Sequence, residues 1–109
     1  KKYALIDWDG TVRKGYTIQQ WMEYLSNRGF GSPYWLNELS HAFADYQAGK
    51  FSHDELAERT AVIYGKSVKG FPASVIAREA HSFMLSDPKN LLPESLKFVQ
   101  YMQKLNISI

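Results

Sequence analysis

A short apolar run near the amino terminus changes abruptly to polar residues. Tyr3-Ala4-Leu5-Ile6 is followed directly by Asp-Trp-Asp-Gly-Thr over residues 7–11. A continuous apolar run of this length is too short for a helix and is typical of a parallel strand that is buried on both faces and ends at a functional loop. The pattern predicts a strand over Tyr3–Ile6. A second strand is expected to begin in Ile107-Ser108-Ile109.

Between these two strands the apolar residues recur at helical spacing. Each predicted helix begins at a capping residue or a proline, and the first three end at or before a glycine. We expect helices to begin at Thr17, at Pro33 after Ser32, at Ser52, at Pro72 and at Pro93, with the first three ending by Gly29, Gly49 and Gly65. Asp87-Pro88-Lys89-Asn90 is predicted as a turn, and Asn106 as a left-handed residue that ends the last helix.

The composition is typical of one soluble globular domain. The chain has 109 residues, of which 45% are hydrophobic and 22% charged. It has no cysteine, which excludes thiolate-bound zinc, disulfides and a cysteine nucleophile. The apolar runs are far shorter than the roughly 20 residues of a membrane helix, and no signal-peptide pattern is present. We therefore expect a cytoplasmic protein with no membrane partner.

The charge pattern does not suggest a nucleic-acid partner. The formal net charge is only +2, and the basic residues are scattered along the chain instead of forming a stripe. We therefore expect the function to depend on a localised group of residues.

Asp7 and Asp9 are the strongest candidates for such a site. Because they lie two residues apart on extended backbone, their side chains should emerge on the same side and can share one cation. Gly10 permits a tight turn that brings backbone amides close to an anion. Aspartate oxygens favour Mg²⁺ over softer metals. An Asp-x-Asp-Gly sequence also begins calcium loops, but the twelfth position of such a loop would here be Ile18 instead of glutamate.

Paired aspartates fit phosphoryl transfer. A carboxylate with an ordinary pKa of about 3.9 is ionised near neutral pH and can attack phosphorus without a base. Mg²⁺ offsets the repulsion between this anion and a phosphomonoester dianion. A second carboxylate, for which Asp9 is the candidate, can protonate the departing alkoxide and later deprotonate water. The alternative is that both acids merely belong to a solvated turn.

The segment Ala4–Val12 resembles the first motif of the haloacid dehalogenase-like (HAD) hydrolases, in which a hydrophobic strand precedes Asp-x-Asp-Gly-Thr. True dehalogenases instead resemble Asp-x-Tyr-Gly-Thr, and P-type ATPases resemble Asp-Lys-Thr-Gly-Thr. The acidic residue at position 9 therefore makes the phosphatases of this superfamily the better match.

This resemblance implies a role for each residue of the motif. It implies that Asp7 is the nucleophile that forms an aspartyl-phosphate, and also a Mg²⁺ ligand. Asp9 would be the general acid/base and would bind the metal through its backbone carbonyl. The phosphate would be bound by the backbone amides of Trp8 and Asp9, in a loop that Gly10 and Thr11 shape.

The resemblance also implies an α/β fold, with a Rossmann-like core and an inserted α-helical cap. Residues 1–16 and 91–109 would form part of the core, and residues 17–90 the cap. So little strand cannot make an independently stable sheet. The family's later Ser or Thr, Lys and acidic pair are also not found. We therefore expect this mostly helical chain to be the N-terminal part of an enzyme that is inactive alone.

Three further residues are candidates for contacts with substrate. Residues 7–11 form what we call the acidic loop. Arg13 and Tyr16 border this loop, where a closing cap could contact them. The sequence around Gly15–Ile18 and Gly49–Ser52 is similar to the phosphoserine phosphatase-like branch. That branch has an acidic residue where Tyr16 stands and an arginine near Arg59. Arg59 either reaches a substrate anion or lies on a helix surface.

The sequence thus predicts a Mg²⁺-dependent phosphomonoester hydrolase acting on a small phosphorylated metabolite. Two alternatives stay open. One is a phosphotransferase that passes the phosphoryl group from the same aspartyl-phosphate to an acceptor other than water. The other is a non-catalytic helical interaction module in which Asp7 and Asp9 are structural.

Overall fold

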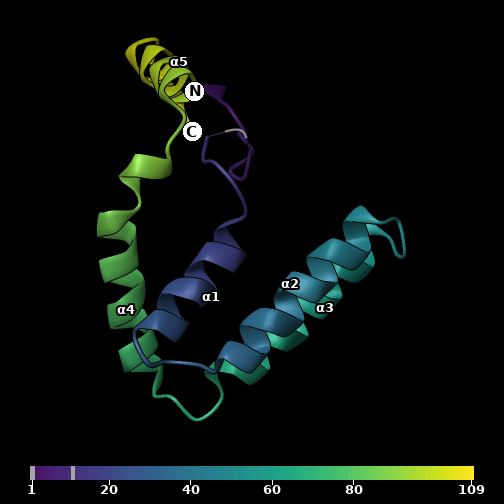
Figure 1. Ribbon diagram of the computed structural model, residues 1–109. Helices are drawn as coiled ribbons and strands as arrows, with labels where there is room; N and C mark the ends of the chain where they lie inside the picture. Colours follow the sequence, from purple (N-terminus) through teal and green to yellow (C-terminus); the bar gives the residue numbers. More distant parts are fainter. Residues whose placement is uncertain (1, 11) are drawn as a thin grey trace. The chain divides into compact units, whose positions relative to one another are not determined.

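The computed structural model describes residues 2–10 and 12–109 of the chain (Figure 1). The described residues are mostly helical, as expected, with five α-helices, one short 3-10 helix and two short strands. They divide into two compact units. The first comprises the chain up to Thr17 together with Met84–Ile109, and the second comprises Ile18–Phe83.

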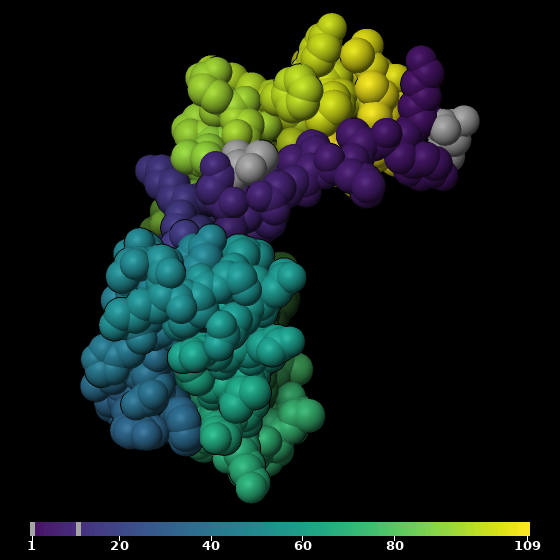
Figure 2. Space-filling model, turned by 90° about the vertical axis from the view of Figure 1, so that its right-hand side faces the viewer, coloured from purple at the N-terminus to yellow at the C-terminus, as the bar shows by residue number. Residues whose placement is uncertain are grey.

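The strands of the first unit are β1 (Lys2–Tyr3) and β2 (Ile107–Ser108), which pair in parallel. Beyond the paired residues, the amide of Ala4 donates to the carbonyl of Ser108 at 2.7 Å. The amino-terminal segment (purple) therefore lies beside the last residues of the chain (yellow) in Figure 2. The prediction of a second strand near the end of the chain is confirmed.

The prediction that Tyr3–Ile6 forms one buried strand is wrong. β1 ends at Tyr3, which is exposed, and Leu5 is 102% exposed. The physical reason is the shortness of β2, which offers only two residues for pairing. Within the described part of the chain, no further strand covers the apolar side chains that follow Tyr3.

Two helical segments complete the first unit. They are the 3-10 helix η1 (Pro88–Asn90) and the helix α5 (Pro93–Lys104). Proline begins both because its missing N–H is not needed in a first turn. Asn106 has a φ of 60°, the left-handed conformation predicted for the residue that ends α5.

The second unit is built from four helices. The first residue of the first of these helices, Thr17, and the last residues of the fourth, Met84–Ser86, belong to the first unit. The four helices are α1 (Thr17–Asn27), α2 (Pro33–Gln47), α3 (His53–Val68) and α4 (Ala73–Ser86). The predicted caps of α2 and α3 are confirmed. The Ser32 side chain accepts from the Tyr34 amide, and the Ser52 side chain accepts from the Glu55 amide, each at 3.2 Å.

One helix end differs from the prediction. α3 continues through Gly65 to Val68. A glycine inside a helix costs only about 1 kcal/mol relative to alanine, so packing can carry a helix past it. Taking Gly65 as the end of the helix therefore placed that end too early.

α2 and α3 lie side by side and share the core of the second unit (Figure 1). Leu39, Phe43 and Leu56 are buried in it, and Leu39 is fully inaccessible to solvent. An aromatic contact joins α1 to α4, because the rings of Trp21 and Phe83 have centroids 5.3 Å apart. No helix in residues 2–10 and 12–109 has the length and apolar character needed to cross a membrane.

Candidate functional site

The backbone that follows β1 forms a tight loop closed by its own hydrogen bonds. The carbonyl of Trp8 accepts from the amides of Val12 and Arg13, at 3.0 and 3.1 Å. The amide of Gly10 donates to the carbonyl of Arg13 at 2.7 Å. Gly10 has a φ of 77°, which a residue with a side chain rarely adopts. The turn predicted at Gly10 is therefore present.

This closure leaves several polar groups of the loop without a partner among the described residues. They are the backbone amides of Trp8 and Asp9, the carbonyl of Asp9 and the carboxylate of Asp7, which is exposed. Amides can bind the oxygens of an anion, and carboxylate and carbonyl oxygens can bind a hard cation. Both kinds of ligand atom therefore occur within three consecutive residues.

The Asp9 carboxylate contacts the start of α1. Its Oδ1 accepts from the backbone amide of Thr17 at 3.1 Å and also from the Thr17 hydroxyl. A carboxylate at a helix N-terminus is stabilised by the helix dipole and by the amides that have no partner within the helix. This contact fixes Oδ1, while Oδ2 has no hydrogen bond to the described residues.

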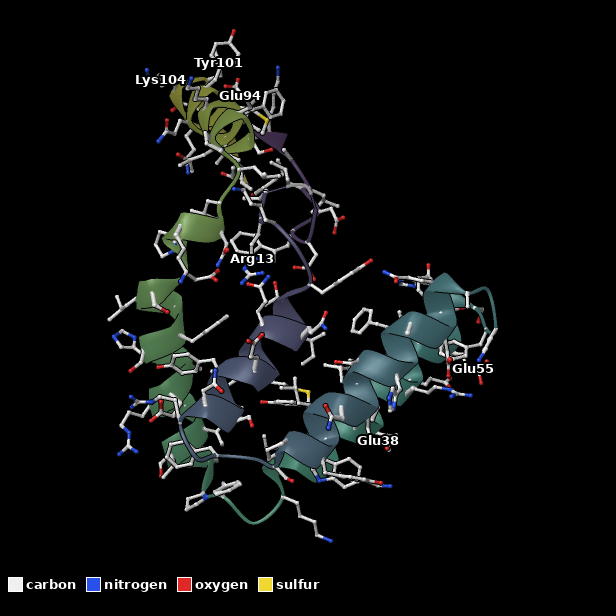
Figure 3. The ribbon with its side chains drawn as sticks, in the orientation of Figure 1. Arg13, Glu38, Glu55, Glu94, Tyr101 and Lys104 are labelled. Atoms are coloured by element: carbon white, nitrogen blue, oxygen red, sulfur yellow. The ribbon has the colours of Figure 1, made fainter. Side chains whose placement is uncertain are left out.

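Arg13 is buried in an ion pair. Its side chain, labelled in Figure 3, is fully inaccessible to solvent. Its Nε and one terminal nitrogen donate to the two carboxylate oxygens of Asp87, at 2.7 and 2.6 Å. This hydrogen bonding by Arg13 lowers the pKa of Asp87 below its ordinary value and raises the pKa of Arg13. The guanidinium considered as a substrate contact is therefore occupied by a partner from the same unit.

The other predicted substrate contacts are Tyr16, in the first unit, and Arg59, in the second. Tyr16 is 42% exposed. Arg59 belongs to the second unit, where it donates to Glu55 at 3.0 Å and lies 4.2 Å from the centroid of the Phe51 ring. Thr11, predicted to help shape the phosphate loop, lies outside the described residues.

The donor chemistry of the loop fits a partial Mg²⁺ site. Mg²⁺ is commonly bound by one or two carboxylates, several waters and the phosphate of a substrate. The Asp7 carboxylate and the Asp9 carbonyl would be the protein ligands. Across the described ranges, no group of three or more histidine, aspartate or glutamate side chains could hold a metal ion.

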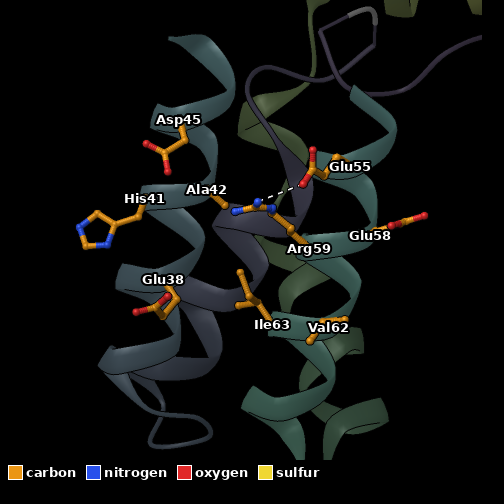
Figure 4. Close-up of a pocket in the computed structure, with 9 residues that line it drawn as sticks. All are labelled: Glu38, His41, Ala42, Asp45, Glu55, Glu58, Arg59, Val62 and Ile63. Atoms are coloured by element: carbon orange, nitrogen blue, oxygen red, sulfur yellow. Dashed lines mark hydrogen bonds and ion pairs between the residues drawn. The ribbon is translucent and has the colours of Figure 1, made fainter. Parts of the chain in front are cut away.

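A separate groove lies in the second unit between α2 and α3 (Figure 4), with a volume of about 420 Å³. Acidic side chains dominate its polar lining, and the Arg59–Glu55 ion pair lies on its α3 side. The charged groups along the groove are Glu38, Asp45, Glu55, Glu58 and Arg59, with His41 beside them. This lining differs from a phosphate site, which requires a surplus of donors.

Sequence reasoning missed Asp87, the partner of Arg13. The Asp87–Asn90 segment was predicted as a turn, and this turn is present as η1. An aspartate before a proline gives no signal that its carboxylate pairs with an arginine 74 positions away.

No protein-family model matches the chain, and neither a curated protein nor a solved structure matches it at a significant level.

Proposed function

We propose that this chain carries the nucleophile loop of a Mg²⁺-dependent phosphomonoester hydrolase, with Asp7 as the nucleophile. One observation supports this most directly. The exposed Asp7 carboxylate is followed by two amides without acceptors among the described residues, in a loop closed by other backbone groups. A nucleophile beside preorganised amides is the arrangement that attack on a phosphoryl group requires. The substrate class is a small phosphorylated metabolite.

The proposed reaction has two steps. First, an oxygen of Asp7 attacks phosphorus, the bond from phosphorus to the ester oxygen breaks, and Asp9 gives a proton to the departing alkoxide. Then Asp9 takes a proton from water, the water oxygen attacks phosphorus, and the bond to Asp7 breaks to release phosphate. Oδ2 of Asp9 is the oxygen suited to carry the proton, because Oδ1 accepts both bonds from Thr17.

The other groups of the loop assist these steps. The amides of Trp8 and Asp9 would hold two phosphoryl oxygens as charge develops on them. When bound by the Asp7 carboxylate and the Asp9 carbonyl, Mg²⁺ would reduce the repulsion between the two anions.

The experiment measures Mg²⁺-dependent binding of beryllofluoride, which mimics a phosphoryl group on aspartate, by ¹⁹F NMR. Asp7→Asn should abolish the signal of bound beryllofluoride, whereas the matched variant Glu23→Gln, an exposed acid of α1, should retain it. A wild-type chain without Asp7-dependent beryllofluoride binding would overturn the proposal.

A second candidate is a non-catalytic helical module. It is favoured by the Asp9–Thr17 contact, which gives Asp9 a structural role at the start of α1 without any reaction. The two candidates differ for Asp7, which has no partner among the described residues to stabilise. In the non-catalytic case, Asp7→Asn should change neither anion binding nor stability.

A further inference from the structure

The Arg13–Asp87 ion pair of the first unit is almost completely enclosed. The Arg13 side chain is 0% exposed and the Asp87 side chain 13%. Two further hydrogen bonds surround the pair. A terminal nitrogen of Arg13 donates to the carbonyl of Lys14 at 3.0 Å, and the Asn90 side-chain amide donates to Asp87 Oδ1 at 3.0 Å.

Backbone hydrogen bonds join the same two segments on either side of the ion pair. The Lys14 amide donates to the Asn90 carbonyl at 2.8 Å, and the Leu92 amide donates to the Val12 carbonyl at 2.7 Å. Arg13 itself bridges to Leu91 in an antiparallel sense. Residues 12–14 are therefore attached to residues 87–92 by main chain and side chain together.

Arg13 also closes the acidic loop through its own backbone. Its amide donates to the Trp8 carbonyl, and its carbonyl accepts from the Gly10 amide. Any displacement of residue 13 would therefore loosen this turn, in which the amides of Trp8 and Asp9 have no partner among the described residues. The Arg13 side chain is fixed by hydrogen bonds to both carboxylate oxygens of Asp87.

We propose that Arg13 and Asp87 are positioning residues for the acidic loop, whose backbone amides would bind an anion. This inference rests on the proposed function, because it assigns the loop amides to a phosphoryl group. Neither side chain touches the substrate. Their paired, buried charges hold the loop in the conformation that accepts the anion, so that no free energy of binding is spent on ordering it.

The geometry of the pair makes this role specific to arginine. Two parallel hydrogen bonds from a planar guanidinium fix both the distance and the orientation of the two segments, whereas lysine is a point charge. Arg28 forms a pair with the same two-bond geometry to Glu79 in the second unit, with nitrogen to oxygen distances of 3.0 and 3.3 Å, but its side chain is 53% exposed. Arg28→Lys is therefore a matched control.

The experiment compares Arg13→Lys and Asp87→Asn with wild type and with Arg28→Lys. Amide hydrogen exchange at Gly10 reports on closure of the loop. Binding of inorganic phosphate in the presence of Mg²⁺ reports on anion affinity, and urea unfolding reports on overall stability. In both variants of the pair we expect roughly 10-fold faster exchange at Gly10 and roughly 10-fold weaker phosphate binding, the size typical of one charge-assisted hydrogen bond. Arg28→Lys should lower stability without either local effect.

The outcomes separate the two proposals. A wild-type chain that binds neither phosphate nor beryllofluoride overturns the proposed function. Wild-type binding that is undiminished in folded Arg13→Lys and Asp87→Asn overturns the positioning role alone. If neither variant folds, Asn90→Ala removes only the bond from Asn90 to Asp87 and should weaken phosphate binding about 3-fold. Unchanged binding and unchanged Gly10 exchange in that variant would equally reject the positioning role.

Discussion

Asp9 makes a structural contact in addition to the chemical role that we propose for it. Its Oδ1 accepts hydrogen bonds from the amide and hydroxyl of Thr17 at the start of α1, whereas Oδ2 has no hydrogen bond to the described residues. The contact also joins the acidic loop to the helix, a partner that the sequence analysis did not predict for this side chain. Replacing Asp9 therefore affects both functions, and Thr17 offers the cleaner test of the structural one.

Thr17→Val should destabilise the chain by about 1 kcal/mol. The substitution keeps the shape of the side chain and the backbone bond to Asp9, but it removes the hydroxyl that donates to Oδ1, a loss comparable to that of a helix cap. Urea unfolding followed by circular dichroism measures the change. Thr60→Val, at a half-buried position within α3, is the control and should stay within about 0.5 kcal/mol of wild type. Equal effects of both substitutions would contradict a stabilising Asp9–Thr17 contact.

The backbone turn at Gly10 was more predictable than the partners of the side chains around it. The sequence predicted the turn at Gly10 because aspartate and glycine at this spacing carry local conformational information. It did not predict that Arg13 is buried, because burial of a charge depends on a partner that is distant in sequence. Local signals cannot report such a pair.

At the scale of elements, Gly65 shows how packing determines where a helix ends. It lies inside α3 with a φ outside the left-handed region, and a methyl group added there would meet no atom within 4 Å. The backbone conformation at position 65 therefore does not require glycine.

Gly65→Ala should stabilise the chain by about 0.5–1 kcal/mol, since alanine loses less backbone entropy in a helix. Gly49→Ala is the matched control. A methyl group there also meets open space, but the φ of 78° is strained for alanine, so this variant should destabilise by about 1 kcal/mol. Thermal or urea unfolding checks both signs. Stabilisation by both substitutions would show that space, and not backbone conformation, governs these sites.

Helices were predictable from the sequence because their caps and spacing are local. The structure confirms to within a residue the helix starts that capping serines and prolines predicted. These residues are Ser32, Ser52, Pro33 and Pro93. β1 was not predictable to the same degree. Its length is set by how many residues β2 offers, and that partner lies at the opposite end of the sequence.

At the scale of the whole molecule, each compact unit contains a carboxylate held by an arginine. Asp87 pairs with Arg13 in the first unit and Glu79 with Arg28 in the second. Hydrogen bonding by the arginine lowers the pKa of each carboxyl below its ordinary value. Since the unfolded chain then binds more protons than the native chain in mild acid, both pairs link stability to pH.

Stability should therefore be fully developed above the ordinary carboxyl pKa of about 4 and decline as the pH falls through the lowered pKa values of the folded state. Urea unfolding between pH 7 and pH 2, with the carboxyl carbons of Asp87 and Glu79 followed by NMR, measures the effect in each unit. Asp87→Asn should flatten the acid dependence of the first unit while leaving the titration of Glu79 unchanged, and Glu79→Gln should do the reverse. A folded-state pKa of Asp87 at or above its ordinary value would contradict the buried ion pair and, with it, the physical basis for assigning Arg13 to the loop.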